Sequence, residues 1–575
     1  EGDVLVLNRK GSNVENPRYL RINSRGGKRE SLSLTNEGFR GIGVKKNMTY
    51  DFSVLYRNAA PGLKLHVELL DSTGQVLGTA VVSPEAGAEE WKKAAVTFSA
   101  NATVLKAKFN LWFEGTGAID LDMVSLFPGD TWKNRKGGLR GDMVKILADM
   151  KPGFIRFPGG CIVEGHELSS RYQWKKTVGP VENRELQVNR WNTEFAHRST
   201  PDYFQTFGLG FFEYFQLAED IGAAAVPILN CGMSCQYNTA ELVELDDLGP
   251  YIQDALDLVE FANGGVETTW GKVRAEMGHP KPFNLKMMGI GNENWGPQYL
   301  ERLALFTAAI KAKYPDMKLI SSSGTDPDGE RVNFLNTELR KQKADIIDEH
   351  YYRPPAWFLE NASRYDQYDR NGAKVFAGEY AAHTGGGGKS PRKNNWEAAL
   401  AEAAFMTGLE RNAAVVQMAS YAPLFAQAEG WQWTPDMIWI DNLNIYGTPN
   451  YYVQKLYSLH KGTDVVSILE EDKVIAGQDG IYASAVMDQK TKELIIKVVN
   501  VTGDTKSRDV ALKGISKLAN KGTMTVINNP DPLAENSFTQ TQYVSPKESG
   551  IAIQKKNISL NLKPYSFTVL RIGMK

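Results

Sequence analysis

Between about residues 130 and 455, apolar runs of strand length alternate with helical stretches, and this alternation constrains the fold more than any other feature. Residues 139–150 have the apolar spacing of an amphipathic helix and lead directly into the apolar run 153–157. This order is typical of βαβ units around a parallel sheet, because parallel strands need a crossover between them. Seven such runs in one region favour a (β/α)₈ TIM barrel over an open sheet. They lie at residues 153–157, 223–230, 285–292, 318–323, 346–352, 374–381 and 413–422.

The two flanks of this region have a different pattern. Short runs with apolar and polar residues in alternation, such as 49–57 and 480–487, are separated by turn residues. Strands of this kind at short, regular spacing predict antiparallel β-sandwiches. The sequence therefore predicts a multidomain protein, in which a β-sandwich at 1–128, a barrel catalytic domain at 129–457 and a second β-sandwich at 458–575 follow one another.

The charge balance excludes some classes of partner. Lys and Arg total 66 and Asp and Glu total 67, so the chain has no overall field to attract nucleic acid or anionic lipid. No apolar run approaches the roughly 18 residues of a membrane span, so we expect neither nucleic acid nor a membrane as partner. The first residues lack the features of a signal peptide. Either a leader was removed, which would make the protein secreted or periplasmic, or the chain is cytoplasmic; we expect the former. The oligomeric state stays open.

The cysteines are too few for a disulfide framework, since only Cys161, Cys231 and Cys235 occur. Cys231 and Cys235 lie four residues apart with no other Cys or His close in sequence, which indicates packed thiols rather than a zinc site. Residues 383–390 read HTGGGGKS and resemble a phosphate-binding loop, but His383 stands at the first glycine position. We therefore expect a loop of the barrel there and no nucleotide.

Two carboxylates end predicted barrel strands. The active site of such a barrel lies at the carboxyl ends of its strands. Glu293 lies in the strand end GIGNENW, and Glu379 lies in the strand end FAGEY. Cleavage of a glycosidic bond requires such a pair, in which a protonated carboxyl donates to the leaving oxygen and an ionised one attacks the anomeric carbon. The alternative is that both are ordinary surface or ion-paired glutamates.

Other polar residues sit at the same predicted strand ends. Asn292 could hydrogen-bond the sugar hydroxyl beside the reacting carbon, or only end a strand in a turn. Arg156, in GFIRFPGGC, is of a type seldom buried without an anion, and an ionised nucleophile or another acid of the barrel core would suit it. His350 and Tyr352 could hydrogen-bond the nucleophile or the sugar, although His350 could also be a satisfied core histidine.

Taken together, the motifs GFIRFPGGC, GIGNENWGPQY, DEHYY and FAGEYA, with the stretch that begins MASYAPLFAQAEGWQWTP, resemble α-L-arabinofuranosidases of glycoside hydrolase family 51. The resemblance covers about residues 126–575, and the region before it looks like the carbohydrate-binding-type sandwich inserted in the longer branch of that family. It implies a retaining, two-step mechanism with Glu293 as acid/base and Glu379 as nucleophile. It implies no metal and no organic cofactor.

The resemblance also implies roles around the two carboxylates. Trp174 matches a loop tryptophan that helps wall the subsite, and Cys161 stands where many members have an Asn that contacts the sugar. In the family the first barrel strand precedes the inserted sandwich, which here begins almost at Glu1, so we expect a segment before Glu1 to carry that strand. The residues at family positions that hold the nucleophile and the sugar hydroxyls are Arg156, Asn292, His350 and Tyr352.

The expected function is an exo-acting α-L-arabinofuranosidase that removes terminal side chains from arabinan or arabinoxylan. Its expected partner is thus an arabinose-containing plant polysaccharide or oligosaccharide. One alternative is a related barrel glycosidase such as an endo-β-glucanase, which an aryl-cellobioside would reveal. The other is a carbohydrate-binding protein with weakened catalysis, which the release of arabinose from polymer would exclude.

Overall fold

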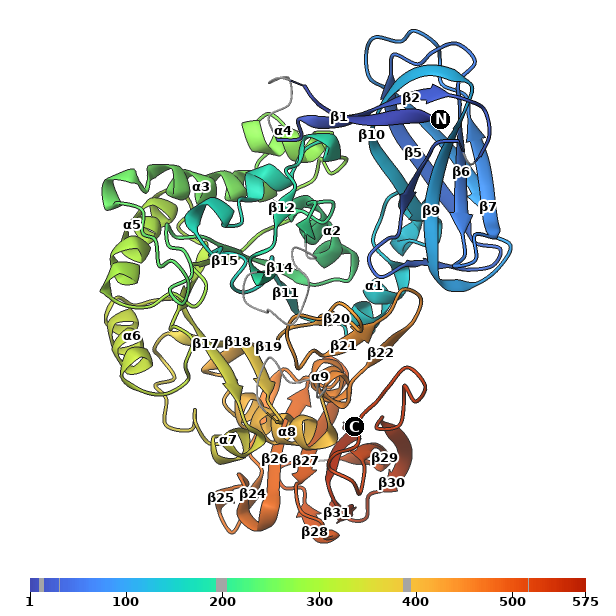
Figure 1. The fold of residues 1–575 in the computed structure, drawn as a ribbon. Coiled ribbons are helices and arrows are strands. Elements are labelled where there is room, and N and C mark those ends of the chain that lie inside the picture. The colour runs from blue at the N-terminus through green and yellow to red at the C-terminus, as the bar shows by residue number, and fades with distance from the viewer. Residues whose placement is uncertain (10–14, 30, 193–203, 386–393, 516, 575) are drawn as a thin grey trace.

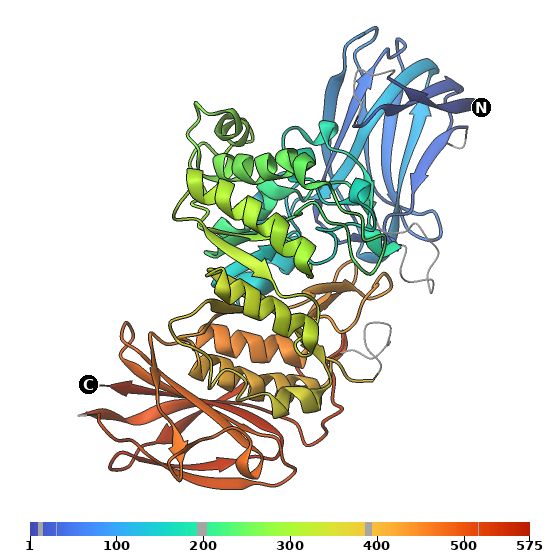
Figure 2. The ribbon, with the colours of Figure 1, turned by 90° about the vertical axis from the view of Figure 1, so that its left-hand side faces the viewer.

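The computed structural model shows a barrel of parallel strands between two antiparallel β-domains, in the predicted order (Figure 1). In the view of Figure 2 the two β-domains again lie at opposite ends of the barrel. Within the described part of the chain, no helix is long and apolar enough to cross a membrane. The structure describes residues 1–9, 15–29, 31–192, 204–385, 394–515 and 517–574.

The N-terminal strands are β1 (Gly2–Asn8), β2 (Arg18–Arg25), β3 (Ser33–Asn36), β4 (Ile42–Val44), β5 (Thr49–Arg57), β6 (Lys64–Leu70), β7 (Val76–Val82), β8 (Lys92–Ser99), β9 (Val104–Glu114) and β10 (Thr116–Pro128). They form two antiparallel sheets, in the orders β1-β2-β10-β5-β8 and β3-β9-β6-β7, with β4 paired to β9. Alternate residues of β5 are buried, as a strand with one face on a core requires. Phe52 of β5 stacks on Phe109 of β9, so the two sheets share one core.

The barrel sheet consists of seven parallel strands in chain order, as the sequence predicts. They are β11 (Phe154–Phe157), β14 (Ala224–Leu229), β15 (Met287–Ile290), β16 (Lys318–Ser322), β17 (Ile346–Arg353), β18 (Lys374–Ala382) and β19 (Val416–Tyr421). Every strand contributes an apolar side chain to a single interior cluster. Phe154 of β11 meets Phe376 of β18, the strand next to the opposite edge, edge to face at 5.3 Å, so the sheet curls round on itself. Among the described residues the edges of this nearly closed barrel are β11 and β19.

One helix precedes the first barrel strand, α1 (Gly141–Ala148), and others fill the connections between the strands. These are α2 (Phe211–Asp220), α3 (Gly249–Asn263), α4 (Thr269–Glu276), α5 (Pro297–Lys313), α6 (Glu330–Lys341), α7 (Pro355–Glu360) and α8 (Trp396–Arg411). Helix α2 begins at Phe211, where the Gly210 backbone N–H donates to Glu213 Oε2 at 2.9 Å and caps the first turn. Residues Phe204–Gln205 form β13, which pairs with β12 (Gln187–Val188). After β19 come β20 (Phe425–Gln427), β21 (Ile438–Ile440), β22 (Ile445–Gly447) and α9 (Pro449–Leu459).

The C-terminal strands are β23 (Asp464–Val466), β24 (Leu469–Glu470), β25 (Lys473–Val474), β26 (Ile481–Asp488), β27 (Glu493–Asn500), β28 (Lys506–Ala511), β29 (Leu518–Asn528), β30 (Lys547–Ala552), β31 (Asn557–Leu562) and β32 (Ser566–Met574). Six of them form one antiparallel sheet, in the order β23-β26-β27-β32-β29-β30. The β28–β31 pair packs on it, because Ile558 and Leu560 share a core with Ile496 and Leu570 of the larger sheet.

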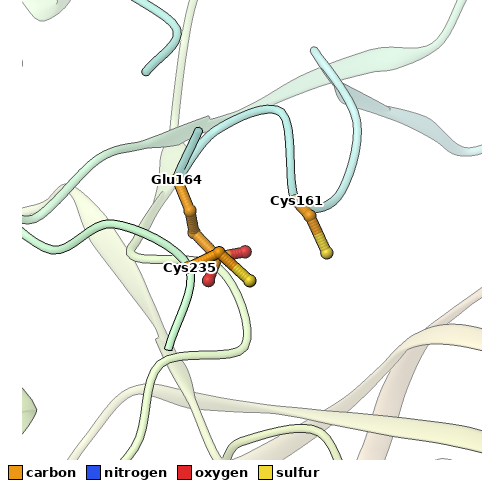
Figure 3. Close-up of side chains that lie close together, drawn as sticks. All are labelled: Cys161, Glu164 and Cys235. Carbon is orange, nitrogen blue, oxygen red and sulfur yellow. The ribbon is translucent and has the colours of Figure 1, made fainter. Parts of the chain in front are cut away.

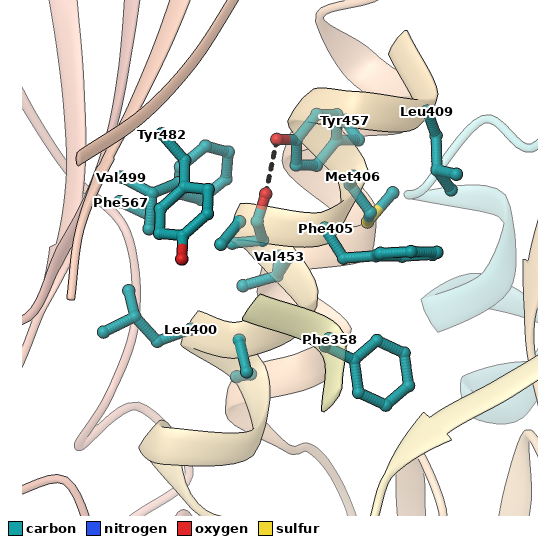
Figure 4. Packing of buried hydrophobic residues seen from close by; sticks show 14 of the residues in the cluster. Phe358, Leu400, Phe405, Met406, Leu409, Val453, Tyr457, Tyr482, Val499 and Phe567 are labelled. Atoms are coloured by element: carbon teal, nitrogen blue, oxygen red, sulfur yellow. Dashed lines mark hydrogen bonds between the residues drawn. The ribbon is translucent and has the colours of Figure 1, made fainter. Parts of the chain in front are cut away.

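Helix α8 joins this sheet to the barrel and is buried along most of its length. Figure 4 shows its residues Leu400, Phe405 and Met406 between Phe358 of α7 and the side chains of the C-terminal sheet, which include Val499. The hydroxyl group of Tyr457 on α9 donates to the Ala403 carbonyl oxygen at 2.8 Å. Because α8 has almost no solvent-exposed face, it joins the barrel and the C-terminal sheet in one continuous core.

A buried ion pair crosses the same interface and allows a test of stability. The Lys497 ammonium of β27, with no exposed side-chain surface, donates to Glu410 Oε1 at 2.5 Å and to the His460 carbonyl oxygen at 2.7 Å. We expect Glu410→Ala to destabilise the fold by about 3 kcal/mol or more, because it leaves a buried charge unpaired. Burial already lowers the pKa of Lys497, so the deficit should shrink as rising pH removes the proton.

The measurement is the temperature of thermal unfolding across a pH series. The control is Glu85→Ala, which removes the exposed partner of Lys92 and should leave that temperature unchanged. Equal shifts in the two variants would contradict the importance of the buried pair.

Candidate active site

The carboxylate of Glu379 reaches its place through an irregularity in β18. Glu349 of β17 pairs with Ala377, but the next residue, His350, pairs with Glu379, so Gly378 is skipped. A Cβ on Gly378 would lie 1.8 Å from Asp348 Oδ1. Only glycine lets the Asp348 carboxylate come this close, and the bulge sets Glu379 beside His350.

The guanidinium of Arg156 on β11 connects side chains from separate strands. Its Nη1 donates to Glu379 Oε1 at 2.8 Å, and its Nη2 donates to Asn292 Oδ1 at 2.7 Å. Nη2 also lies 3.5 Å from Asp348 Oδ2. Burial opposes the charge, but the carboxylates of Glu379 and Asp348 raise the pKa of Arg156 on balance, so it stays a cation. Arg156 thus has the anionic partner that its position on a buried strand requires.

The second oxygen of Glu379 has a donor of its own. The Tyr352 hydroxyl group donates to Oε2 at 2.8 Å, while His350 Nδ1 lies 3.6 Å away from this oxygen. Burial, together with the charge of Glu379, raises the pKa of Tyr352 well above its usual value, so the phenol keeps its proton. With a donor on each oxygen and only 8% of its side chain exposed, Glu379 is held as an oriented carboxylate.

Glu293 lies in a tight turn after β15. Its φ is +52°, and that of Gly291 is +80°. A Cβ on Gly291 would lie 2.6 Å from Asn294 Oδ1, which accepts a hydrogen bond from the Asn292 backbone N–H at 3.0 Å. A positive φ at a residue other than glycine costs of order 1 kcal/mol, and it persists here because the Asn294 side chain closes the turn. The turn aims the Glu293 side chain toward the other strand ends.

His350 links Glu293 to the rest of the site. Its Nδ1 lies 2.8 Å from Glu293 Oε1, and its Nε2 lies 3.3 Å from Asp348 Oδ2. Burial lowers the pKa of His350, but the charges of Glu379 and Asp348 outweigh it and raise the pKa well above 6.5. Burial raises the pKa of Glu293, yet the hydrogen bond and charge of His350 lower it on balance. The His350–Glu293 pair therefore holds one proton along its hydrogen bond.

Three potential ligand atoms, one each from Glu293, His350 and Glu379, lie within 4.8 Å of one another. By residue type alone this group could hold a metal ion. However, a guanidinium cation already neutralises Glu379 and a protonated imidazole already neutralises Glu293. The site thus places an oriented carboxylate, Glu379, beside a hydrogen-bonded His350–Glu293 pair.

The structure brings most of the predicted site residues together. Cys161 joins them, because its Sγ lies 3.4 Å from Glu293 Oε2. The predicted residues that converge at the carboxyl ends of the strands are Arg156, Cys161, Asn292, Glu293, His350, Tyr352 and Glu379.

Trp174 is not among them. It lies in a 3₁₀ turn, is only 1% exposed, and packs against Trp270 and Phe261. Its Nε1 donates to the Asp254 carbonyl oxygen at 2.9 Å. An indole buried on all sides has no face for a sugar, so the prediction that Trp174 walls the subsite is wrong, and the residue belongs to the core.

Sequence reasoning missed Asp348 and Glu164. Asp348 lies two residues before His350, so the alternation of a strand puts both on one face, and this spacing could have revealed it. Glu164 accepts a hydrogen bond from Asn292 Nδ2 at 2.9 Å, and burial raises its pKa well above the usual value. It comes from a loop without a repeating pattern, so nothing in the sequence marked it. Most of the glycine-rich stretch 383–390 lies outside the described residues.

A barrel with two facing carboxylates at its strand ends is typical of glycoside hydrolases, and the comparisons with known proteins assign the chain to this class. The family model described as the α-L-arabinofuranosidase 1 domain matches residues 146–370, and that of the α-L-arabinofuranosidase C-terminal domain matches residues 378–566. α-L-Arabinofuranosidase 1 of Arabidopsis thaliana is 35% identical, over 93% of this chain and 75% of its own length. The chain belongs to the α-L-arabinofuranosidases of glycoside hydrolase family 51.

Other relatives agree. An extracellular exo-α-L-arabinofuranosidase of Streptomyces chartreusis is 42% identical over 81% of this chain, which spans only 54% of that protein's length. The arabinose-bound structure of the α-L-arabinofuranosidase MgGH51 superposes with a TM-score of 0.87 at 29% identity, covering 100% of this chain and 90% of that one. The α-L-arabinofuranosidase of Thermotoga maritima, at 20% identity, superposes with a TM-score of 0.61 over 76% of this chain and 90% of its own, and shares the fold.

The close approach at Gly378 yields a test of the site. We expect Gly378→Ala to lower kcat/KM by at least about 100-fold, because the new methyl group must displace Asp348 and the groups it holds, and small misplacements have such effects. Hydrolysis of an aryl α-L-arabinofuranoside and far-ultraviolet circular dichroism measure activity and folding. The matched control is Gly550→Ala in β30, where a Cβ meets nothing within 4 Å. If the folded Gly378→Ala enzyme kept full activity, the assigned positions of Asp348 and Glu379 would be untenable.

Proposed function

We propose that the protein is a retaining, exo-acting α-L-arabinofuranosidase that removes terminal arabinofuranosyl side chains from arabinan or arabinoxylan. One observation carries the retaining mechanism: a carboxylate oxygen of Glu293 and one of Glu379 lie within 4.8 Å of each other. Carboxyl groups stand about 5–5.5 Å apart in retaining glycosidases and about 6.5–9.5 Å apart in inverting ones, which need room for a water. The names of the relatives support the sugar, and the Streptomyces name supports exo action outside the cell.

In the first step Glu379 attacks the anomeric carbon, and the bond from that carbon to the leaving oxygen breaks. The single proton of the pair passes from His350 Nδ1 to Glu293 across 2.8 Å, and Glu293 delivers it to the leaving oxygen, so that the pair ends with a neutral imidazole and an ionised carboxylate. The products are the released alcohol and an arabinosyl ester on Glu379. Arg156 and Tyr352, each with a hydrogen bond to Glu379, keep the attacking oxygen aligned. Asn292, held by Arg156 and Glu164, is placed to bind the hydroxyl next to the reacting carbon.

In the second step a water attacks the ester, gives its proton to the His350–Glu293 pair, and frees Glu379. The charges explain why this pair changes role from acid to base. Formation of the ester neutralises Glu379, whose charge is the strongest attraction that raises the pKa of His350. The pair has by then lost its proton to the leaving group, so one negative charge moves from Glu379 to the pair and the net charge of the site is conserved. A buried site thereby avoids the desolvation of an additional charge.

The two carboxylates should respond differently to substitution. We expect Glu379→Ala to abolish turnover of every substrate. Glu293→Ala should retain at least about 100-fold more of its kcat/KM on an activated aryl arabinofuranoside than on arabinan, because a good leaving group needs little protonation. Arabinose release and aryl hydrolysis measure the two cases. Equal losses on both substrates would contradict the acid role of Glu293.

The proton shared by His350 and Glu293 predicts a pH effect. The raised pKa of His350 keeps a proton on the pair above neutral pH, so the alkaline limb of kcat/KM in the parent enzyme should lie well above pH 6.5. In His350→Asn, Glu293 must hold the proton alone, and we expect the alkaline limb to move to lower pH. Rates on an aryl arabinofuranoside across pH test this. An alkaline limb that does not move in the active variant would show that His350 does not store the proton.

A further inference from the structure

A second group of reactive side chains lies against the site. Cys161 follows β11, and Cys235 follows β14. Figure 3 shows their side chains close to that of Glu164. Both Sγ atoms and a carboxylate oxygen of Glu164 lie within 4.8 Å of one another. The sequence indicated packed thiols for Cys231 and Cys235, with no other cysteine near. The fold instead supplies Cys161 from a distant segment as the close neighbour of Cys235.

This group is polar, and its members are fixed by their surroundings. Cys235 is 3% exposed and Glu164 is 2% exposed. Arg190 Nη2 lies 3.6 Å from Cys235 Sγ, and Asn292 Nδ2 donates to Glu164 Oε2 at 2.9 Å. Buried carboxyl and thiol groups rarely cluster in a protein core without a function, because a charge that forms on them there is not solvated by water.

Ligand atoms within 4.8 Å of one another need only small side-chain rotations to surround one ion. Bonds of about 2.3 Å to sulfur and about 2.0–2.2 Å to oxygen put neighbouring ligand atoms about 3.3–3.8 Å apart. The 3.4 Å between Cys161 Sγ and Glu293 Oε2 already matches one edge of such a tetrahedron. Two sulfurs and two oxygens make a complete set of four ligands. Thiolates select zinc or cadmium over magnesium and calcium.

We propose that Cys161, Glu164 and Cys235 bind a thiophilic divalent cation such as Zn²⁺ or Cd²⁺, with Glu293 as the fourth ligand, and that the bound ion inhibits the enzyme. On binding, the two thiols and the Glu164 carboxyl group release their protons to solvent, and metal–sulfur and metal–oxygen bonds form in place of the S–H and O–H bonds. Two thiolates and the Glu164 carboxylate balance the charges of the ion and of Arg190. Inhibition rests on the proposed function, since a coordinated Glu293 cannot transfer a proton, whereas binding itself does not.

The ion has a route to this site. Cys161 is partly exposed and contacts Glu293, which is also partly exposed, so both border the space in which the sugar reacts. An ion would thus enter by the path of the substrate, and substrate should compete with it. While Glu293 coordinates the ion, the substrate cannot bind productively, and while the substrate is bound, Glu293 cannot coordinate the ion.

The experiment titrates Cd²⁺ into the full chain without oxygen and follows thiolate-to-cadmium absorption in the ultraviolet, with aryl arabinofuranoside hydrolysis measured in parallel. We expect one Cd²⁺ per chain and inhibition that substrate relieves. Cys235→Ala should leave the metal-free activity unchanged and remove the absorption. It should also raise the half-inhibitory concentration of Cd²⁺ at least about tenfold, because loss of a group that only hydrogen-bonds to a metal ligand already weakens metal binding about 10–100-fold. Cys231→Ser removes a thiol outside the cluster and keeps a donor for Asn294 Oδ1, so it is the matched control and should behave as the parent.

Absent absorption in the parent, or equal absorption in the parent and Cys235→Ala, would overturn the proposal. So would recovery of only one free thiol from the denatured parent enzyme, since that result means a disulfide between two of the three cysteines. Absorption with no inhibition of an active enzyme would overturn the assignment of Glu293 as a ligand. A parent that binds Cd²⁺ but hydrolyses no arabinofuranoside refutes the proposed function and leaves the metal site supported by its absorption.

Discussion

The guanidinium of Arg156 is the interaction on which the site depends. It contributes a permanent positive charge to the end of a barrel where Asp348, Glu379 and Glu293 gather within a few ångströms. Without that charge the negative charges of these carboxylates would repel one another with no cation to offset them. Lysine would not substitute, because a planar fork is needed to reach Glu379 with one nitrogen and Asn292 with the other.

Much of this site could be predicted because, in a barrel, the position of a residue along its strand determines its position in the fold. A polar residue that ends an apolar strand must lie at one rim of the barrel, so Arg156, His350, Tyr352 and Glu379 were expected to converge, and they do. Their chemical roles remain predictions. Trp174 misled because a tryptophan in a loop motif says nothing about which way its ring faces, and here the ring faces the core.

The fold shows the same limit at a larger scale. Apolar–polar alternation predicted the two β-domains, and apolar runs between helical stretches predicted all seven barrel strands, because hydrophobic periodicity is a local property. Two features were beyond such reasoning. The skipped Gly378 depends on pairing between strands, and the approach of Cys161 to Cys235 depends on two loops whose course no periodicity records. Loops follow tertiary contacts, so their contents are the last to be read from a sequence.

Glu293 lies between the predicted site residues and the cysteine cluster that the sequence did not predict. One oxygen faces His350, which shares a proton with it, and the other faces the Cys161 thiol. The groups around a carboxylate change its proton affinity. In the proposed mechanism Glu293 donates a proton in one step and accepts one in the next, so its neighbours must respond to the charge on Glu379. His350 responds in this way because Glu379 dominates the forces that raise its pKa. A thiol beside the other oxygen is a weak donor that leaves this balance nearly intact, until a cation converts it into a thiolate and takes the carboxylate as well.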